Sequence, residues 1–176
     1  MRQIVTLQRL SRGRKRKGQT FNNHLYKQNH MKRTINQIIV HCTATPAGRD
    51  VRKTDVDRWH RARGFRGIGY HYLVLMDGTV EQGRPENQIG AHCLGHNSRS
   101  IGICYVGGLD DATGKPADTR TPAQRTALEH LVETLCRRYP DATVHGHREF
   151  AAKACPCFDA AREYGHYHVE AAHEKD

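Results

Sequence analysis

The stretch from Val144 to Phe158, VHGHREFAAKACPCF, places two histidines, a lysine and two cysteines within fifteen positions. Imidazole and thiolate groups are the usual zinc ligands of proteins. Such a stretch is compatible with a structural zinc site, with a redox pair of thiols, or with half of a catalytic site completed elsewhere in the chain. The spacing of the residues, and the elements that carry them, must distinguish these three interpretations.

A structural zinc site formed by this stretch alone would use His145, His147, Cys155 and Cys157. Structural sites commonly pair ligands as Cys-x2-4-Cys and His-x3-5-His, whereas the pairs here are His-x-His and Cys-x-Cys. Alternate residues of a strand share a face, so the two histidines could still point to one site. The two cysteines are too close in sequence for an unstrained disulfide, which favours metal ligation or packing for Cys155.

A catalytic zinc site needs three protein ligands and a fourth position open to water. His41, His147 and Cys155 would supply two imidazoles and a thiolate. Zinc in such a site lowers the pKa of its water and polarises a carbonyl group. Lys153 could stabilise a developing oxyanion, and Tyr70 could hydrogen-bond to that oxyanion or to the attacking water. Because the chain has thirteen histidines, composition alone does not select this set.

The predicted strands place these residues at strand ends. Apolar runs within residues 35–44, 100–108 and 142–147 predict buried strands. The predicted strand within residues 35–44 ends at His41. Residues 69–84 predict a β-hairpin, because two apolar runs flank an Asp-Gly turn. This hairpin indicates a mixed sheet rather than a wholly parallel one.

Two helices are predicted between these strands. One begins near Thr54 and Asp55, and the other is capped by Thr121, has Pro122 at its first position and is stopped by Pro140. Strands interleaved with helices predict a single α/β domain with a central mixed β-sheet flanked by helices. In such folds the strand ends and the loops that follow them carry the functional site.

The net charge of +10 is concentrated at the N-terminus. Residues 1–30 hold eight of the 28 basic residues and none of the 18 acidic ones, so residues 31–176 carry 20 basic and 18 acidic side chains. We predict that residues 1–30 are a disordered basic extension, which could contact an anionic surface or nucleic acid. Translation starting at Met31 is the alternative.

Targeting signals are not predicted. The N-terminal region lacks the apolar segment of a signal peptide, and no run of eighteen apolar residues predicts a transmembrane helix. The six cysteines are therefore expected to be thiols or metal ligands rather than disulfides.

Five ordered motifs together resemble the zinc-dependent N-acetylmuramoyl-L-alanine amidases of the phage lysozyme type, a family that includes the peptidoglycan recognition proteins. The motifs are IIVHCTAT, GIGYHYLVLMDGTVEQGRP, IGAHCLGHNSRSIGICYVGG, TPAQRTAL and HGHREFAAKACPCFD. The resemblance covers about residues 35 to 162. A mixed β-sheet flanked by helices is the fold that it implies.

The resemblance implies one zinc ion per chain, held by His41, His147 and Cys155, with catalytic support from Tyr70 and Lys153. It also implies that the segment containing His92 and Asn97 lines the substrate groove. The implied reaction is hydrolysis of the amide bond between N-acetylmuramic acid and L-alanine in peptidoglycan. Cys157 departs from the small residue often found there, and it is either a bystander or a competing ligand.

The sequence therefore predicts a monomeric endolysin of a phage or prophage, with a catalytic domain at residues 31–165 and a polar tail at residues 166–176. Without a signal peptide it would be cytoplasmic until released to the cell wall. Two other functions remain open at this point: a peptidoglycan-binding module without catalysis, and a nucleic-acid-binding protein that uses residues 1–30. Cys155 favours the enzyme, because family members that only bind peptidoglycan typically lack this thiolate.

Overall fold

A computed structural model describes residues 33–168, so the predictions for residues 1–30 and for the tail beyond His168 lie outside the described residues. The strands are β1 (Gln37–Cys42), β2 (Thr45–Pro46), β3 (Tyr72–Val74), β4 (Val80–Gln82), β5 (Ser100–Tyr105), β6 (Gly108–Leu109) and β7 (Thr143–Gly146). The helices are α1 (Lys53–Ala62), α2 (Pro122–Arg138) and α3 (Ala160–Tyr164), with 3-10 turns η2 (Asn97–Arg99) and η3 (His147–Glu149). No helix in residues 33–168 is long and apolar enough to cross a membrane.

Five strands form a mixed sheet in the order β4-β3-β5-β1-β7. β1 runs parallel to both of its neighbours, β5 and β7, while β3 and β4 form the predicted antiparallel hairpin. The mixed sheet predicted from the sequence is therefore confirmed. A second sheet of only two strands, β2 and β6, was not predicted, because each of these strands has two residues.

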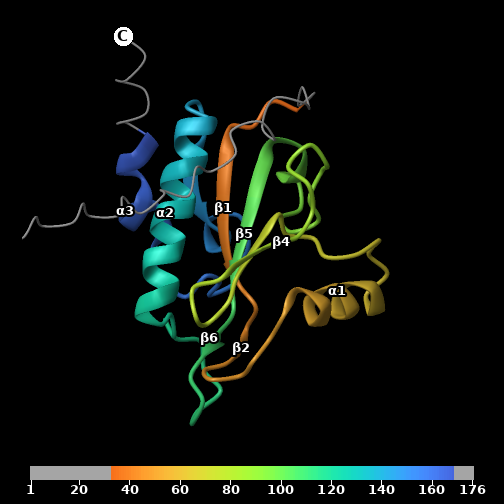
Figure 1. The fold of residues 1–176 in the computed structure, drawn as a ribbon, viewed down its shortest axis with the longest axis vertical. Helices are drawn as coiled ribbons and strands as arrows, with labels where there is room; N and C mark the ends of the chain where they lie inside the picture. The colour runs from red at the N-terminus through yellow and green to blue at the C-terminus, as the bar shows by residue number, and fades with distance from the viewer. Residues whose placement is uncertain (1–32, 169–176) are drawn as a thin grey trace, which may run out of the picture. The chain divides into compact units, whose positions relative to one another are not determined.

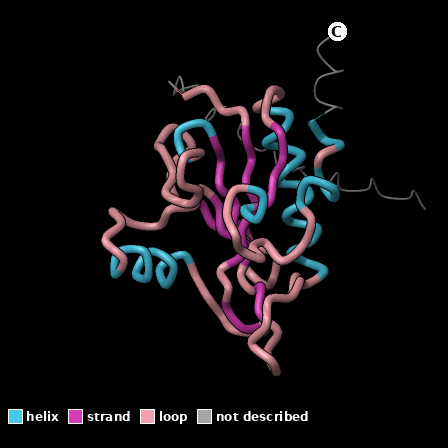
Figure 2. Tube along the Cα trace, turned by 180° about the vertical axis from the view of Figure 1, so that it is seen from behind, coloured by secondary structure: helices cyan, strands magenta, loops and turns pink. Residues whose placement is uncertain are grey.

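The two faces of the sheet are covered by different helices. Figure 1 and the reverse view in Figure 2 show α2 and α3 on one side of the sheet and α1 on the other. Ile38, Val40 and Cys42 of β1 pack in the core cluster that contains the buried residues of α2 and α3. Val56 of α1 belongs to the second cluster, with Leu73 of β3. Because residues alternate along a strand, His41 faces away from the α2 side.

The two long helices begin differently from each other. Thr121 caps α2 as predicted: its Oγ1 accepts the backbone N–H of Gln124 at 3.1 Å, and the Gln124 side chain accepts the N–H of Thr121. Helix α1 begins at Lys53, earlier than predicted. Asp55 lies in its first turn and accepts the backbone N–H of Arg52 at 3.0 Å, so Asp55 completes the cap instead of preceding the helix.

Candidate active site

The sheet register brings two of the predicted ligands together. Val40 of β1 pairs with Gly146 of β7 in parallel register, so the next residues, His41 within β1 and His147 just after β7, lie side by side at the carboxyl ends of these strands. The ring centroids of the two histidines are 4.5 Å apart. His147 is the first residue of η3 rather than the end of a strand, because β7 stops at Gly146.

Cys155 completes the group from the loop between η3 and α3. One ligand atom from each of His41, His147 and Cys155 lies within 4.8 Å of the other two. The Sγ atom of Cys155 is 3.9 Å from Nδ1 of His41 and accepts the backbone N–H of Cys42 at 3.2 Å. This contact holds the sulfur atom of Cys155 beside β1, next to His41. The three residues therefore present the donor set of an open zinc site.

His145 and Cys157 point away from this group. Nδ1 of His145 lies 2.6 Å from Oε2 of Glu149, and Sγ of Cys157 donates to the carbonyl of Gly108. Neither residue belongs to the metal-ligand group found among the described residues. The hypothesis of a structural zinc site built from this stretch alone is therefore wrong, and His41 from the sheet is the third partner.

The far side of the His41 ring contacts His92. Nε2 of His41 is 3.0 Å from Nδ1 of His92, and Nε2 of His92 is 3.3 Å from Oγ of Ser100. A neutral His41 that offers Nδ1 to a metal carries its proton on Nε2, and this N–H can donate to His92. Burial lowers the pKa of both His41 and His92 well below the usual range. Both rings are therefore neutral near pH 7, as metal ligation requires.

The His92 ring packs against the backbone of a glycine in β5. A Cβ atom added to Gly102 of β5 would lie 2.5 Å from Cδ2 of His92, so only glycine leaves room for the ring. The sequence offered no sign of this contact, because it depends on how His92 folds back over β5. His92, which is predicted to line the substrate groove, thus also contacts His41, a proposed metal ligand.

Asn97 organises the loop that carries His92. Its Oδ1 accepts the backbone N–H groups of His92 and Cys93 at 2.8 and 2.9 Å. The guanidinium of Arg33 holds the same loop from outside, donating to the carbonyls of Asn97 and Ser100 at 2.9 and 2.8 Å. Sequence analysis did not identify Arg33.

Tyr70 and Lys153 border the ligand group. Both line a cavity of about 200 Å³ together with His147 and Cys155. The Tyr70 ring centroid is 5.2 Å from that of His41, and burial raises the pKa of Tyr70 well above its usual value. Tyr70 therefore keeps its proton near neutral pH. The Lys153 side chain is exposed at the rim.

A larger cleft of about 530 Å³ opens beside this cavity. It shares Tyr70, His147 and Lys153 with the cavity, and its lining includes His92 and Asn97, the residues expected in the substrate groove. Residues that sequence analysis did not single out also line it, and these include His60, Arg63, Phe65 and Phe150. The candidate metal-binding group therefore borders a cleft that is larger than its own cavity.

Comparison with known proteins agrees with this geometry. Residues 31–158 match the Amidase_2 family, described as N-acetylmuramoyl-L-alanine amidase. An endolysin of Enterobacteria phage K11 is 44% identical over 126 residues, which cover 72% of this chain and 83% of the relative.

Solved structures show the same likeness. The N-acetylmuramoyl-L-alanine amidase LysC from Clostridium intestinale has a TM-score of 0.63 and 31% identity, covering 74% of this chain and 82% of LysC. Bumblebee PGRP-SA has a TM-score of 0.61 and 26% identity, covering 73% of this chain and 79% of that protein. The chain therefore belongs to the N-acetylmuramoyl-L-alanine amidase family, and the fold and amidase activity implied by the resemblance are confirmed.

Proposed function

We propose that this amidase uses a single zinc ion held by His41, His147 and Cys155. The observation that carries the proposal is the convergence of their ligand atoms to within 4.8 Å, although His41 and Cys155 are 114 positions apart in the sequence. Two neutral imidazoles and a thiolate are a donor set that zinc accepts, and a water or substrate atom takes the fourth position of such a site.

The zinc ion would lower the pKa of a bound water and polarise the scissile carbonyl. The protein residues then have separate tasks. Tyr70 retains its hydroxyl proton and can donate it in a hydrogen bond to the attacking water or the developing oxyanion. Lys153 brings a positive charge to the same cavity, where it favours the negative charge of the transition state over the neutral amide.

The substrate we propose is the glycan–peptide of peptidoglycan, cleaved between the lactyl group of N-acetylmuramic acid and L-alanine. The larger cleft would bind the polymer, with His92 and Asn97 on its wall. The similarity to phage endolysins supports a role in wall degradation during phage release. We propose that the enzyme acts as a monomer, remains in the cytoplasm until lysis and then reaches the wall.

The test combines zinc content with digestion of purified peptidoglycan, using wild type, Cys155→Ala and Cys157→Ser. We expect one zinc per chain and new L-alanine amino termini from the wild type and from Cys157→Ser, because Cys157 is outside the ligand group. Cys155→Ala should lose both. Zinc retained by Cys155→Ala together with full activity would refute the ligand assignment.

The basic extension needs a separate test. We propose that residues 1–30 provide any contact with anionic surfaces or nucleic acid, because residues 31–176 are nearly neutral. Deleting residues 1–30 should abolish salt-sensitive binding to DNA and leave wall digestion intact. DNA binding that survives the deletion would contradict this assignment.

A further inference from the structure

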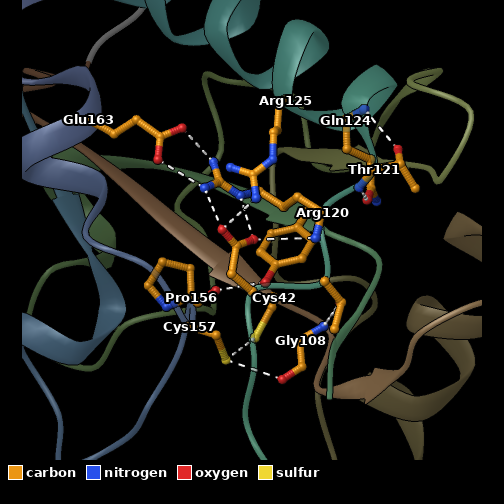
Figure 3. A network of polar contacts seen from close by, with 12 residues as sticks. Cys42, Gly108, Arg120, Thr121, Gln124, Arg125, Pro156, Cys157 and Glu163 are labelled. Carbon is orange, nitrogen blue, oxygen red and sulfur yellow. Dashed lines mark hydrogen bonds and ion pairs between the residues drawn. The ribbon is translucent and has the colours of Figure 1, made fainter. Parts of the chain in front are cut away.

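Two cysteines that lie next to the ligand residues bring their sulfur atoms together. The Sγ atoms of Cys42 and Cys157 are 3.9 Å apart, although the residues are 115 positions apart in the sequence (Figure 3). Cys42 directly follows His41 at the end of β1, and Cys157 lies two positions beyond Cys155. Neither thiol belongs to the metal-ligand group of the described residues.

The backbone of β6 packs closely against the sulfur atoms of both cysteines. Sγ of Cys157 donates to the carbonyl of Gly108 at 3.2 Å, and Figure 3 shows this contact beside the pair. A Cβ atom on Gly108 would lie 2.5 Å from Sγ of Cys42 and 3.7 Å from Sγ of Cys157. Because Gly108 has no side chain, the two sulfur atoms meet in van der Waals contact.

The surroundings of the pair are anchored by a buried ion-pair network. Arg120, which is labelled in Figure 3, lies in the loop before α2 and donates to Asp118 and Glu163. Its guanidinium carbon lies 3.2 Å from the ring centroid of Phe158, the residue after Cys157. This network ties α3 and the Phe158 segment to the loop before α2. The segment that carries Cys157 is therefore held against the loop between β6 and α2 without any covalent link.

The two thiols differ in their exposure to solvent. Cys42 is 5% exposed, whereas Cys157 is half-buried and lines an open cleft of about 460 Å³ with Arg148 and Lys153. The two cationic side chains would attract an anionic reagent to this cleft. A reagent can therefore reach Cys157 first, and Cys42 lies behind it.

We propose that Cys42 and Cys157 are a redox modification site that closes to a disulfide by exchange with a small anionic disulfide such as oxidised glutathione. The Cys157 thiolate attacks one sulfur of the reagent and releases the first glutathione thiolate. Cys42, as its thiolate, then attacks Sγ of Cys157 and releases the second. The two cysteines lose two electrons and two protons, and two reduced glutathione molecules carry them.

The product would tie together the segments that carry the ligands. A disulfide has its sulfur atoms about 2.05 Å apart, so the Cys42 and Cys157 sulfurs must approach by roughly 1.9 Å. The bond would then join the end of β1, next to His41, to the loop that carries Cys155, and it would restrict the unfolded chain across most of the domain.

The physiological setting rests on the proposed function. An endolysin made in a reducing cytoplasm would hold both thiols reduced, and it would meet oxidising conditions on reaching the envelope. The disulfide would then strengthen the enzyme where it works. The chemistry of the pair itself depends on neither the zinc assignment nor the amidase reaction.

The experiment incubates the full-length, zinc-loaded protein with oxidised glutathione for hours, because Cys157 is half-buried and exchange requires access to its sulfur atom. We expect an intact mass lower by two hydrogen atoms and a proteolytic fragment that links Cys42 to Cys157. The oxidised protein should keep its zinc and melt several degrees higher than the reduced protein.

Two variants and a control separate the steps. Cys42→Ser should stop at a mixed disulfide of Cys157 with one glutathione, while Cys157→Ser should form neither adduct nor bridge at Cys42. Cys136→Ala, which changes a buried cysteine of α2, should bridge like the wild type. A bridge that includes Cys155, with loss of zinc, would overturn the proposal, as would unmodified Cys42 and Cys157 in the wild type. Since mapping the bridge needs no activity, failure here is distinguishable from failure of the zinc site.

Discussion

Nε2 of His41 and Nδ1 of His92 lie 3.0 Å apart, on the side of the His41 ring opposite to the nitrogen that faces Cys155. A histidine that binds a metal through one nitrogen is oriented by the partner of its other nitrogen. If His41 holds the metal as proposed, its contact with His92 would fix both the orientation and the tautomer of the His41 ring. Ser100 continues the chain of contacts on the far side of His92.

Replacing His92 should weaken zinc binding without unfolding the protein. We expect His92→Ala to raise the zinc dissociation constant by about 10- to 100-fold, as loss of such partners typically does. His92→Asn is the matched control, because its Oδ1 can accept the His41 N–H in place of Nδ1 and should restore most of the affinity. Competition with a chromophoric chelator measures the affinity, and the melting temperature of the metal-free protein monitors the fold. Wild-type affinity in His92→Ala would exclude the positioning role.

Tyr70→Phe removes one hydroxyl and keeps the aromatic ring. The ring packs between His41 and His60, with centroids 5.2 Å from each, so we expect the fold and zinc content to be preserved. If the hydroxyl donates to the transition state, kcat should fall by about 10²- to 10³-fold while KM changes little. Wild-type kcat would instead show that the hydroxyl takes no part in the transition state.

Lys153→Met keeps most of the side-chain length and removes the charge. We expect a fall of about 10²-fold in kcat with one zinc per chain retained, because Lys153 lines the cavity beside the ligands but is not one of them. Lys153→Arg, which keeps the charge, should retain a larger share of the activity. Equal rates of muropeptide release by Lys153→Met and Lys153→Arg would contradict a role for the positive charge.

Acid should destabilise the protein through two buried histidines that are not metal ligands. Nδ1 of His60 accepts the N–H of Gly69 at 2.8 Å, and Nδ1 of His71 accepts the N–H of Gly102 at 2.9 Å. Burial lowers the pKa of each to about 4, against about 6.5 in an unfolded chain. Between these values the unfolded chain binds more protons, so the free energy of unfolding falls as the pH is lowered.

The size of this effect is at most about 3 kcal/mol for each histidine, and it should vanish above about pH 6.5. Urea unfolding of the metal-free protein at several pH values between about 4 and 7 measures it, with chelator present so that metal binding does not contribute. His60→Asn can accept the Gly69 N–H without titrating, so its stability should depend less steeply on pH. A wild-type unfolding free energy that is constant across this range would contradict the assignment.

The elements with local signals were predictable from the sequence. Thr121 and Gln124 cap α2 through contacts three residues apart, and the Asp77-Gly78 turn joins β3 to β4. The resemblance, rather than the spacing, selected the three proposed ligands among thirteen histidines and six cysteines, and the structure brings these three residues together. Spacing alone disfavoured a site that includes His145 and Cys157 but did not exclude it.

The contacts that could not be predicted from the sequence are mainly those between side chains of distant segments. The contact of His92 with His41 requires the space left by Gly102, and that of Cys42 with Cys157 requires the register of β6 against the loop after Cys155. These two contacts are set by packing between distant segments, which a local sequence pattern does not encode. The start of α1 differs from the prediction for a local reason, because the Asp55 carboxylate accepts the backbone N–H of Arg52 from inside the first turn.

The position of the ligands along the chain has a consequence for biosynthesis. His41 lies on β1, whose backbone is paired on both sides by β5 and β7, while His147 and Cys155 both follow β7. A ribosome that has completed β1, β3, β4 and β5 has therefore made only one of the three proposed ligands. On the proposed assignment, the nascent enzyme would stay inert toward the wall until residues 147–155 have emerged, so translation itself would delay the appearance of lytic activity.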